Sequence, residues 1–286
     1  MTANQPIAAI ARHAPWREMT RIELDAAYDN SAHVRDSAAK LAGWAQRSER
    51  LRALHPGRLN RRYGPLPRNV IDIFSCGVSG APLLVFIHGG YWQRNSKEVF
   101  SCMAEGPLTA GFDVALPGYT LAPDMGLTGI VAEIRAALIW LRREGPALGV
   151  ASGQLIVSGW SAGGHLATLA MSWPEVDAGL SISGLYDLEP IRLGTLNDKL
   201  GLSPADALAL SPVRHLPRRA GQLAVAYGMA ELPELQRQSR DFFASWTSAG
   251  LEGNLLPLDD RNHFSVLDEL ATPDGRLARA LHHLVR

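Results

Sequence analysis

The sequence predicts an α/β fold, with a mostly parallel central sheet, helices on both faces of it and a helical extension at the N-terminus. Short apolar runs alternate with helical patterns from Val70 onward, which is typical of strands joined by helices. The run at 83–87 is apolar on both faces, as in a central buried strand. Residues 1–68 differ, because they are rich in Arg and Ala and carry apolar residues at helical spacing.

Each element follows from its local pattern. The expected strands are 70–74, 83–87, 112–116, 154–157, 180–183, 223–226 and 255–258, and the expected helices are 127–143, 161–172, 234–248 and 275–284. A further helix is expected from Val34 to Leu54, with Asn30 or Ser31 as its cap. Residues 55–69 are rich in Gly and Pro and are expected to form a linker.

Two parts are therefore expected: an extension at 1–68, which is a candidate lid, and an α/β domain at 69–286. Within that domain, residues 185–217 break the strand–helix rhythm. They are expected to form an insertion over the carboxyl end of the sheet, where ligands bind in open α/β folds.

Composition excludes several classes of protein. The chain has 28 basic and 28 acidic residues, which argues against a nucleic-acid partner and gives no reason to expect binding to a membrane surface. No apolar run is long enough to span a membrane, and the N-terminus has no secretory signal. Cys76 and Cys102 are too few for a disulfide framework, so a cytoplasmic location is expected. The sequence does not determine the oligomeric state, and a homodimer is one of the open alternatives.

The pentapeptide Gly159-Trp160-Ser161-Ala162-Gly163 lies between an apolar strand and a helix. This is the G-x-S-x-G nucleophile elbow in the context that it requires, and it predicts an α/β-hydrolase fold with Ser161 as nucleophile. Small residues are needed on both sides of the serine because the turn is sharp and strained. The alternative is a chance Gly-Ser-Gly turn before a helix.

A second motif, HGGYW at 88–92, follows the buried strand 83–87. An HGG loop at this place predicts an oxyanion hole, made by the N–H groups of Gly89 or Gly90 together with that of Ala162. His88 is expected to fix this loop by a hydrogen bond. The bulky residues beside the two motifs are candidates for the wall of a small acyl pocket, with core packing as the alternative: Tyr91, Trp92 and Trp160.

Chain position selects the base and the acid. Of nine histidines, His263 alone follows a late strand and a polar loop, where a base is needed. The chain order of this fold is Ser, acid, His, and Glu231 is the first carboxylate after the strand 223–226. A helix N-terminal role is the alternative for Glu231. The other candidate acids are Asp187, Glu234, Asp259 and Asp260.

Several segments together resemble the kynurenine formamidase (arylformamidase) branch of α/β hydrolases. They are HGGYW at 88–92, GWSAGGH at 159–165, SGLYDLEPI at 183–191, ELPELQRQSRDF at 231–242 and NHFSV at 262–266, together with YDNSAHV at 28–34. The resemblance implies Ser161, His263 and Glu231 as catalytic triad. Two positions depart from it: the family usually has Asp where this chain has Glu231, and a His commonly stands where it has Trp160.

The resemblance implies hydrolysis of N-formylkynurenine to formate and kynurenine. A carboxylesterase for short acyl esters would use the same machinery on another leaving group. A non-catalytic binding module on this scaffold is a third interpretation, but such chains usually lose the nucleophile or the base. The expected partner is a small-molecule substrate. No cofactor and no metal are implied, since His88 and His165 lack carboxylate partners at ligand spacing.

Overall fold

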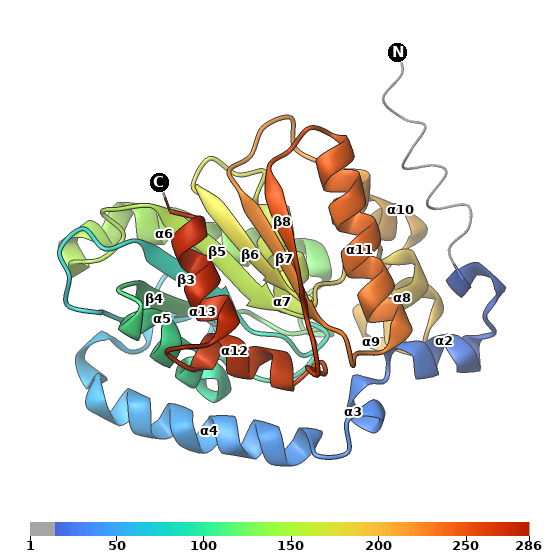
Figure 1. The fold of residues 1–286 in the computed structure, drawn as a ribbon, viewed down its shortest axis with the longest axis horizontal. Helices are drawn as coiled ribbons and strands as arrows, with labels where there is room; N and C mark the ends of the chain where they lie inside the picture. Colours follow the sequence, from blue (N-terminus) through green and yellow to red (C-terminus); the bar gives the residue numbers. More distant parts are fainter. Residues whose placement is uncertain (1–14, 286) are drawn as a thin grey trace.

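An eight-stranded sheet lies at the centre of the protein (Figure 1). The computed structural model describes residues 15–285. The strand order is β1-β2-β4-β3-β5-β6-β7-β8, with parallel pairing from β4 through to β8 and antiparallel pairing of β2 with β1 and β4. The strands are β1 Arg61–Arg62, β2 Val70–Phe74, β3 Leu83–Ile87, β4 Asp113–Pro117, β5 Leu155–Trp160, β6 Ala178–Ile182, β7 Leu223–Gly228 and β8 Gly253–Leu258. The predicted mostly parallel sheet is confirmed.

Helices cover both faces of this sheet, as predicted. The α-helices are α2 Arg21–Tyr28, α3 Asn30–His33, α4 Ser37–Leu54, α5 Glu105–Thr109, α6 Leu127–Glu144, α7 Ala162–Ala170, α8 Glu189–Leu193, α9 Asn197–Leu200, α10 Pro204–Ala209, α11 Pro233–Ser248, α12 Asp268–Ala271 and α13 Arg276–Ala280. Short 3₁₀ helices are η1 Pro15–Glu18, η2 Pro56–Arg58, η3 Lys97–Ala104, η4 Pro146–Leu148, η5 Pro212–Arg214, η6 Ser265–Leu267 and η7 Leu281–His283.

The strand β3 shows why the sheet must be covered twice. Its side chains alternate between two hydrophobic clusters: Leu83, Val85 and Ile87 join one, and Leu84 and Phe86 join the other. The helices α6, α7, α8 and α11 supply the first cluster, whereas α4, η3, α12 and α13 supply the second. A strand that is apolar on both faces can bury all of its side chains only in such a three-layer arrangement.

The N-terminal extension lies along one side of the molecule, with α3 between α2 and α4 (Figure 1). The helix α4 packs on η3, where the Ser48 hydroxyl accepts from the Cys102 N–H and donates to the Val99 carbonyl. At the other end, the buried Tyr28 hydroxyl of α2 donates to Glu234 of α11 over 3.1 Å. The extension is therefore bound to elements on both faces of the sheet.

Two expectations about this extension were wrong. The long helix begins at Ser37, not after a cap at Asn30 or Ser31; Asn30 instead opens the short helix α3, which Asp29 caps. The Asn30 amide is held elsewhere, because its Nδ2 donates to the Tyr91 hydroxyl. The expected linker at 55–69 contains an edge strand, β1, which pairs with β2.

The segment 185–217 follows β6 and contains three short helices, α8, α9 and α10, with η5 after them. It contacts the extension, since the Thr195 N–H donates to Asp25 of α2 over 2.7 Å. In the described part of the chain, no helix combines the length and the apolar character needed to cross a membrane.

Candidate active site

Ser161 lies at a sharp turn between β5 and α7. Its backbone has φ 57° and ψ −117°, a conformation that costs free energy in a residue with a side chain. The surroundings hold it there, because its N–H donates to the Ile182 carbonyl over 2.9 Å. A Cβ atom at Gly159 would lie 2.2 Å from the Gly163 carbonyl oxygen, and one at Gly163 would lie 2.0 Å from that of Ile87. This lack of space accounts for both glycines of the motif.

His263 and Glu231 form a buried pair at the ends of neighbouring strands. Glu231 follows β7 and His263 follows β8, and the His263 Nδ1 lies 3.0 Å from the Glu231 Oε2. The other carboxylate oxygen of Glu231 accepts from the Ser183 hydroxyl and from the Gly228 N–H, each over 2.6 Å. These two donors hold the Glu231 carboxylate in place beside the imidazole of His263.

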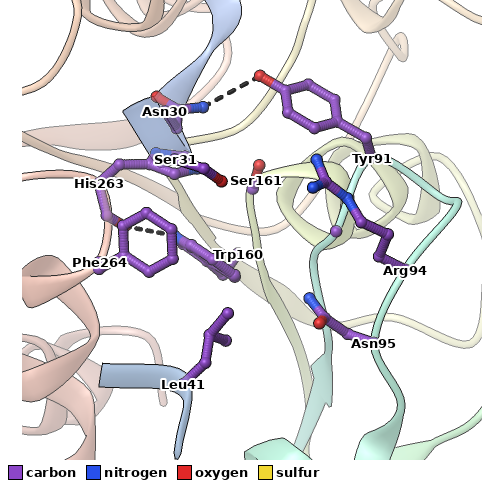
Figure 2. Close-up of a pocket in the computed structure, with 11 residues that line it drawn as sticks. Asn30, Ser31, Leu41, Tyr91, Arg94, Asn95, Trp160, Ser161, His263 and Phe264 are labelled. Carbon is purple, nitrogen blue, oxygen red and sulfur yellow. Dashed lines mark hydrogen bonds between the residues drawn. The ribbon is translucent and has the colours of Figure 1, made fainter. Parts of the chain in front are cut away.

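Ser161 and His263 line the same cavity (Figure 2). Trp160, the residue before the serine, packs on His263, with the two ring centroids 4.9 Å apart. Its Nε1 donates to the His263 carbonyl over 2.7 Å. The indole therefore supports the backbone and the ring of His263 as well as lining the cavity.

The HGG loop runs directly against the serine. A Cβ atom at Gly89 would lie 2.6 Å from the Trp160 carbonyl oxygen and 3.1 Å from the Ser161 Cβ, so only glycine permits this approach. The Gly89 carbonyl accepts from the Asn95 Nδ2 and the His88 Nδ1, and a trans peptide then turns the Gly90 N–H in the opposite direction. At the start of α7, the Ala162 N–H has no intrahelical carbonyl to bind. These N–H groups are available as donors beside the serine.

His88 has the structural position expected for it. A carbonyl can only accept, so the contact of 2.9 Å with the Gly89 oxygen places the proton of His88 on Nδ1. The ring stacks on Tyr119 at a centroid distance of 4.3 Å, and burial lowers the pKa of His88 to about 4. His88 is therefore neutral near pH 7 and fixes the loop.

Of the three aromatic candidates for the pocket wall, Tyr91 and Trp160 line the cavity. Trp92 is not among its lining residues: the indole is fully buried and packs edge-on against His165, with ring centroids 5.0 Å apart. His165 also packs there, and its Nε2 lies 2.8 Å from the Leu210 carbonyl oxygen. Trp92 therefore packs in the core and does not line the pocket.

Sequence reasoning missed half of the cavity wall. The missed residues are Asn30, Ser31, Leu41, Arg94, Asn95 and Phe264. The first three come from the extension, and in Figure 2 they lie across the cavity from the residues of the HGG loop. The segment YDNSAHV at 28–34, part of the resemblance, was the one signal that could have indicated Asn30 and Ser31.

The other candidate acids lie away from the imidazole. Asp187 forms an ion pair with Arg214 over 3.3 Å, and Glu234 accepts from Tyr28 and Arg237. Asp259 and Asp260 are exposed at the turn after β8. Among residues 15–285, no group of three His, Cys, Asp or Glu side chains is placed to hold a metal ion.

Comparisons with known proteins agree with this architecture. A family model described as BD-FAE matches residues 71–178. Kynurenine formamidase of Danio rerio is 28% identical, over 94% of this chain and 98% of its own, and that of Drosophila melanogaster is 27% identical, over 78% and 80%. A solved structure from a Silicibacter species, for which a thioesterase activity has been proposed, is 30% identical with a TM-score of 0.83, over 91% of this chain and 99% of its own.

Esterase B from Lactobacillus rhamnosis, solved with a tributyrin phosphonate inhibitor, shares the fold with a TM-score of 0.67. It is 19% identical and the match covers 86% of this chain and 93% of that one. The protein is therefore a hydrolase, and the chain belongs to the kynurenine formamidase-like branch of the α/β-hydrolase superfamily.

Proposed function

We propose that the protein is a serine hydrolase that removes a formyl group from an aryl formamide of the N-formylkynurenine type. Ser161 is the nucleophile, His263 the general base and Glu231 the acid that orients it. One observation carries the proposal: the buried Glu231–His263 pair faces the same cavity as a serine held at a strained turn. The kynurenine formamidases that match nearly the whole chain support the choice of substrate.

The contacts suggest a sequence of steps. The proton on the Nδ1 of His263 faces Glu231, so the Nε2 is free to take the proton of the Ser161 hydroxyl as its oxygen attacks the formyl carbon. The N–H groups of Gly89 or Gly90 and of Ala162 bind the oxyanion that forms, and each such donor contributes about 3 kcal/mol to the transition state. His263 then gives its proton to the leaving arylamine nitrogen. A water molecule, deprotonated by His263, releases formate from the serine.

The competing candidate is a carboxylesterase for short acyl esters. It is favoured by the esterases among the solved structures that share this fold. The two functions need the same serine, base and oxyanion donors and differ in the leaving group. An arylamine must be protonated as it leaves, whereas an activated phenol leaves without help. A non-catalytic module is the third candidate, and a serine-directed phosphonate probe that fails to label the protein would favour it.

Paired kinetics of the wild type and Ser161→Ala on N-formylkynurenine and p-nitrophenyl acetate test the proposal. We expect N-formylkynurenine to be cleaved with kcat/KM of about 10⁴ M⁻¹s⁻¹ or more, and Ser161→Ala to abolish this activity. The matched control is Ser172→Ala, since the Ser172 hydroxyl is exposed and bonds only within its own turn of helix. Cleavage of the ester alone would replace the formamidase proposal by the esterase one.

A further inference from the structure

A second space, here called the outer cavity, adjoins the cavity that holds Ser161, here called the inner cavity. Four residues line both: Asn30, Ser31, Tyr91 and Arg94. The far wall of the outer cavity comes from α2 and from the segment after β6, with Asp25, Tyr28, Asp29, Thr195 and Leu196. A substrate whose scissile bond lies at Ser161 can therefore extend past Arg94 into the outer cavity.

Arg94 is the one permanently charged residue among those that line the inner cavity in the described part of the chain. In Figure 2 its guanidinium end is turned toward the cavity, beside Tyr91 and Asn95. Within residues 15–285 no carboxylate forms an ion pair with it. An unpaired guanidinium with five N–H donors, at the wall between two cavities, is placed to bind an anion.

The backbone of Arg94 is held in the turn that also carries the oxyanion donors. Its N–H donates to the Gly90 carbonyl over 3.0 Å, and a Cβ atom at Gly90 would lie 2.5 Å from the Arg94 carbonyl oxygen. The next residue, Asn95, donates to the Gly89 carbonyl, and its own carbonyl accepts from Arg68 over 2.7 Å. The guanidinium therefore extends from a backbone segment that is held in place next to the proposed reaction centre.

We infer that Arg94 is a specificity-determining residue, which binds a carboxylate on the leaving group of the substrate, with the outer cavity as the subsite that takes this part of the molecule. The inference rests on the proposed function, because it presumes that acyl transfer occurs at Ser161. Leu41, Trp160 and Phe264 give the inner cavity an apolar wall for an aromatic ring. A planar guanidinium binds a carboxylate by two parallel hydrogen bonds, which fixes orientation as well as charge.

The acidic residues of the outer cavity are compatible with this role. One oxygen of Asp25 accepts from Thr195, and one oxygen of Asp29 caps α3, so neither neutralises Arg94. Their carboxylates would repel a bare anion and attract an ammonium group. In a leaving group with an ammonium group next to its carboxylate, the ammonium would meet the carboxylates of Asp25 and Asp29, and the carboxylate would meet Arg94. Arg94 is therefore the residue that recognises the carboxylate.

The test compares Arg94→Gln with the wild type on two formanilides that differ only in the charged end: N-formylkynurenine and 2-acetylformanilide. Because the proposed contact is with the carboxylate of the leaving group and not with the reacting bond, the effect belongs in KM. We expect kcat/KM for N-formylkynurenine to fall about 10-fold, the low end for a hydrogen bond to a charged group, because the guanidinium is exposed. For 2-acetylformanilide it should change less than about 2-fold. For Arg94→Lys, kcat/KM for N-formylkynurenine should be intermediate, because the charge is kept but the two parallel hydrogen bonds are lost. For Arg94→Glu it should be lower than for Arg94→Gln, because the new carboxylate repels that of the substrate.

Arg143→Gln is the matched control, because Arg143 is an exposed arginine of α6 outside both cavities. An equal loss on both formanilides, or no loss on either, would overturn the inference. If the wild type cleaves neither formanilide but cleaves aryl acetates, the formamidase proposal fails by itself. The pair 3-(2-acetoxyphenyl)propanoate and 2-ethylphenyl acetate then tests Arg94 in the same way: a selective loss on the anionic ester supports its role, and an unselective result overturns it.

Discussion

Replacing Glu231 by Gln should remove most of the catalytic power while keeping the shape of the site. The Oε1 atom of Glu231 accepts from the Gly228 N–H and the Ser183 hydroxyl, so a Gln carbonyl would keep this place and turn its NH₂ toward His263. Two donors would then face each other, which forces the His263 proton from Nδ1 to Nε2. In that tautomer the imidazole cannot accept the proton of Ser161. We expect kcat to fall about 10³- to 10⁴-fold, or about 4 to 5 kcal/mol of transition-state stabilisation.

The assay is the steady-state rate on p-nitrophenyl acetate and on N-formylkynurenine, with folding checked by urea unfolding. Glu231→Asp restores the carboxylate on a shorter side chain and should recover part of the rate. Asp187→Asn is the control, since Asp187 pairs with Arg214 and lies away from the imidazole; its kcat should stay within about 3-fold. A loss below 10-fold in Glu231→Gln, or an equal loss in Asp187→Asn, would refute this account of the acid.

Three further outcomes follow from contacts near the serine. Gly163→Ala places a methyl group 2.0 Å from the Ile87 carbonyl oxygen, so urea unfolding should show a loss of about 3 kcal/mol or more. Trp160→Phe removes the donor to the His263 carbonyl. The value of kcat should fall, while the free energy of unfolding should change little. Burial lowers the pKa of His165 to about 4. The stability that neutral, buried His165 contributes is therefore complete above pH 6.5 and is lost as the pH falls toward 4. His165→Gln should reduce the acid-side slope of the free energy of unfolding against pH by about 1.4 kcal/mol per pH unit.

The elements that the sequence predicts best need no distant partner to define them. The strands β2 and β3 have the expected bounds; β3 is a run of apolar residues buried on both faces, and such a run is determined by its own side chains. The strand β1 escaped prediction because its two arginines are exposed, and only its pairing with β2 makes it a strand. Sequence patterns thus predict burial far better than they predict backbone pairing.

The site shows the same division. Ser161 and His263 were predicted from local motifs and chain order, and Glu231 from chain order alone. Asn30 could not be assigned to the cavity, since its place depends on a hydrogen bond to Tyr91, a residue far along the chain. Trp92 was misleading because an indole beside a catalytic motif has the same sequence signature in a core as in a pocket. Its positive φ of 57° turns the chain at this point, and its indole packs on His165.

The structure separates the proposed chemistry from the choice of substrate. Ser161, His263 and Glu231 all follow strands of the sheet, so their relative geometry depends on the fold that esterases share with this protein. Other parts of the cavity lining come from α3, from α4 and from the turn that carries Arg94, none of which belongs to the sheet. A change in the extension can therefore alter which leaving group the cavity accepts without moving Ser161, His263 and Glu231. Removing residues 1–55 should shift the ratio of formamide to ester cleavage; a loss of stability with an unchanged ratio would contradict a substrate-selecting role for this segment.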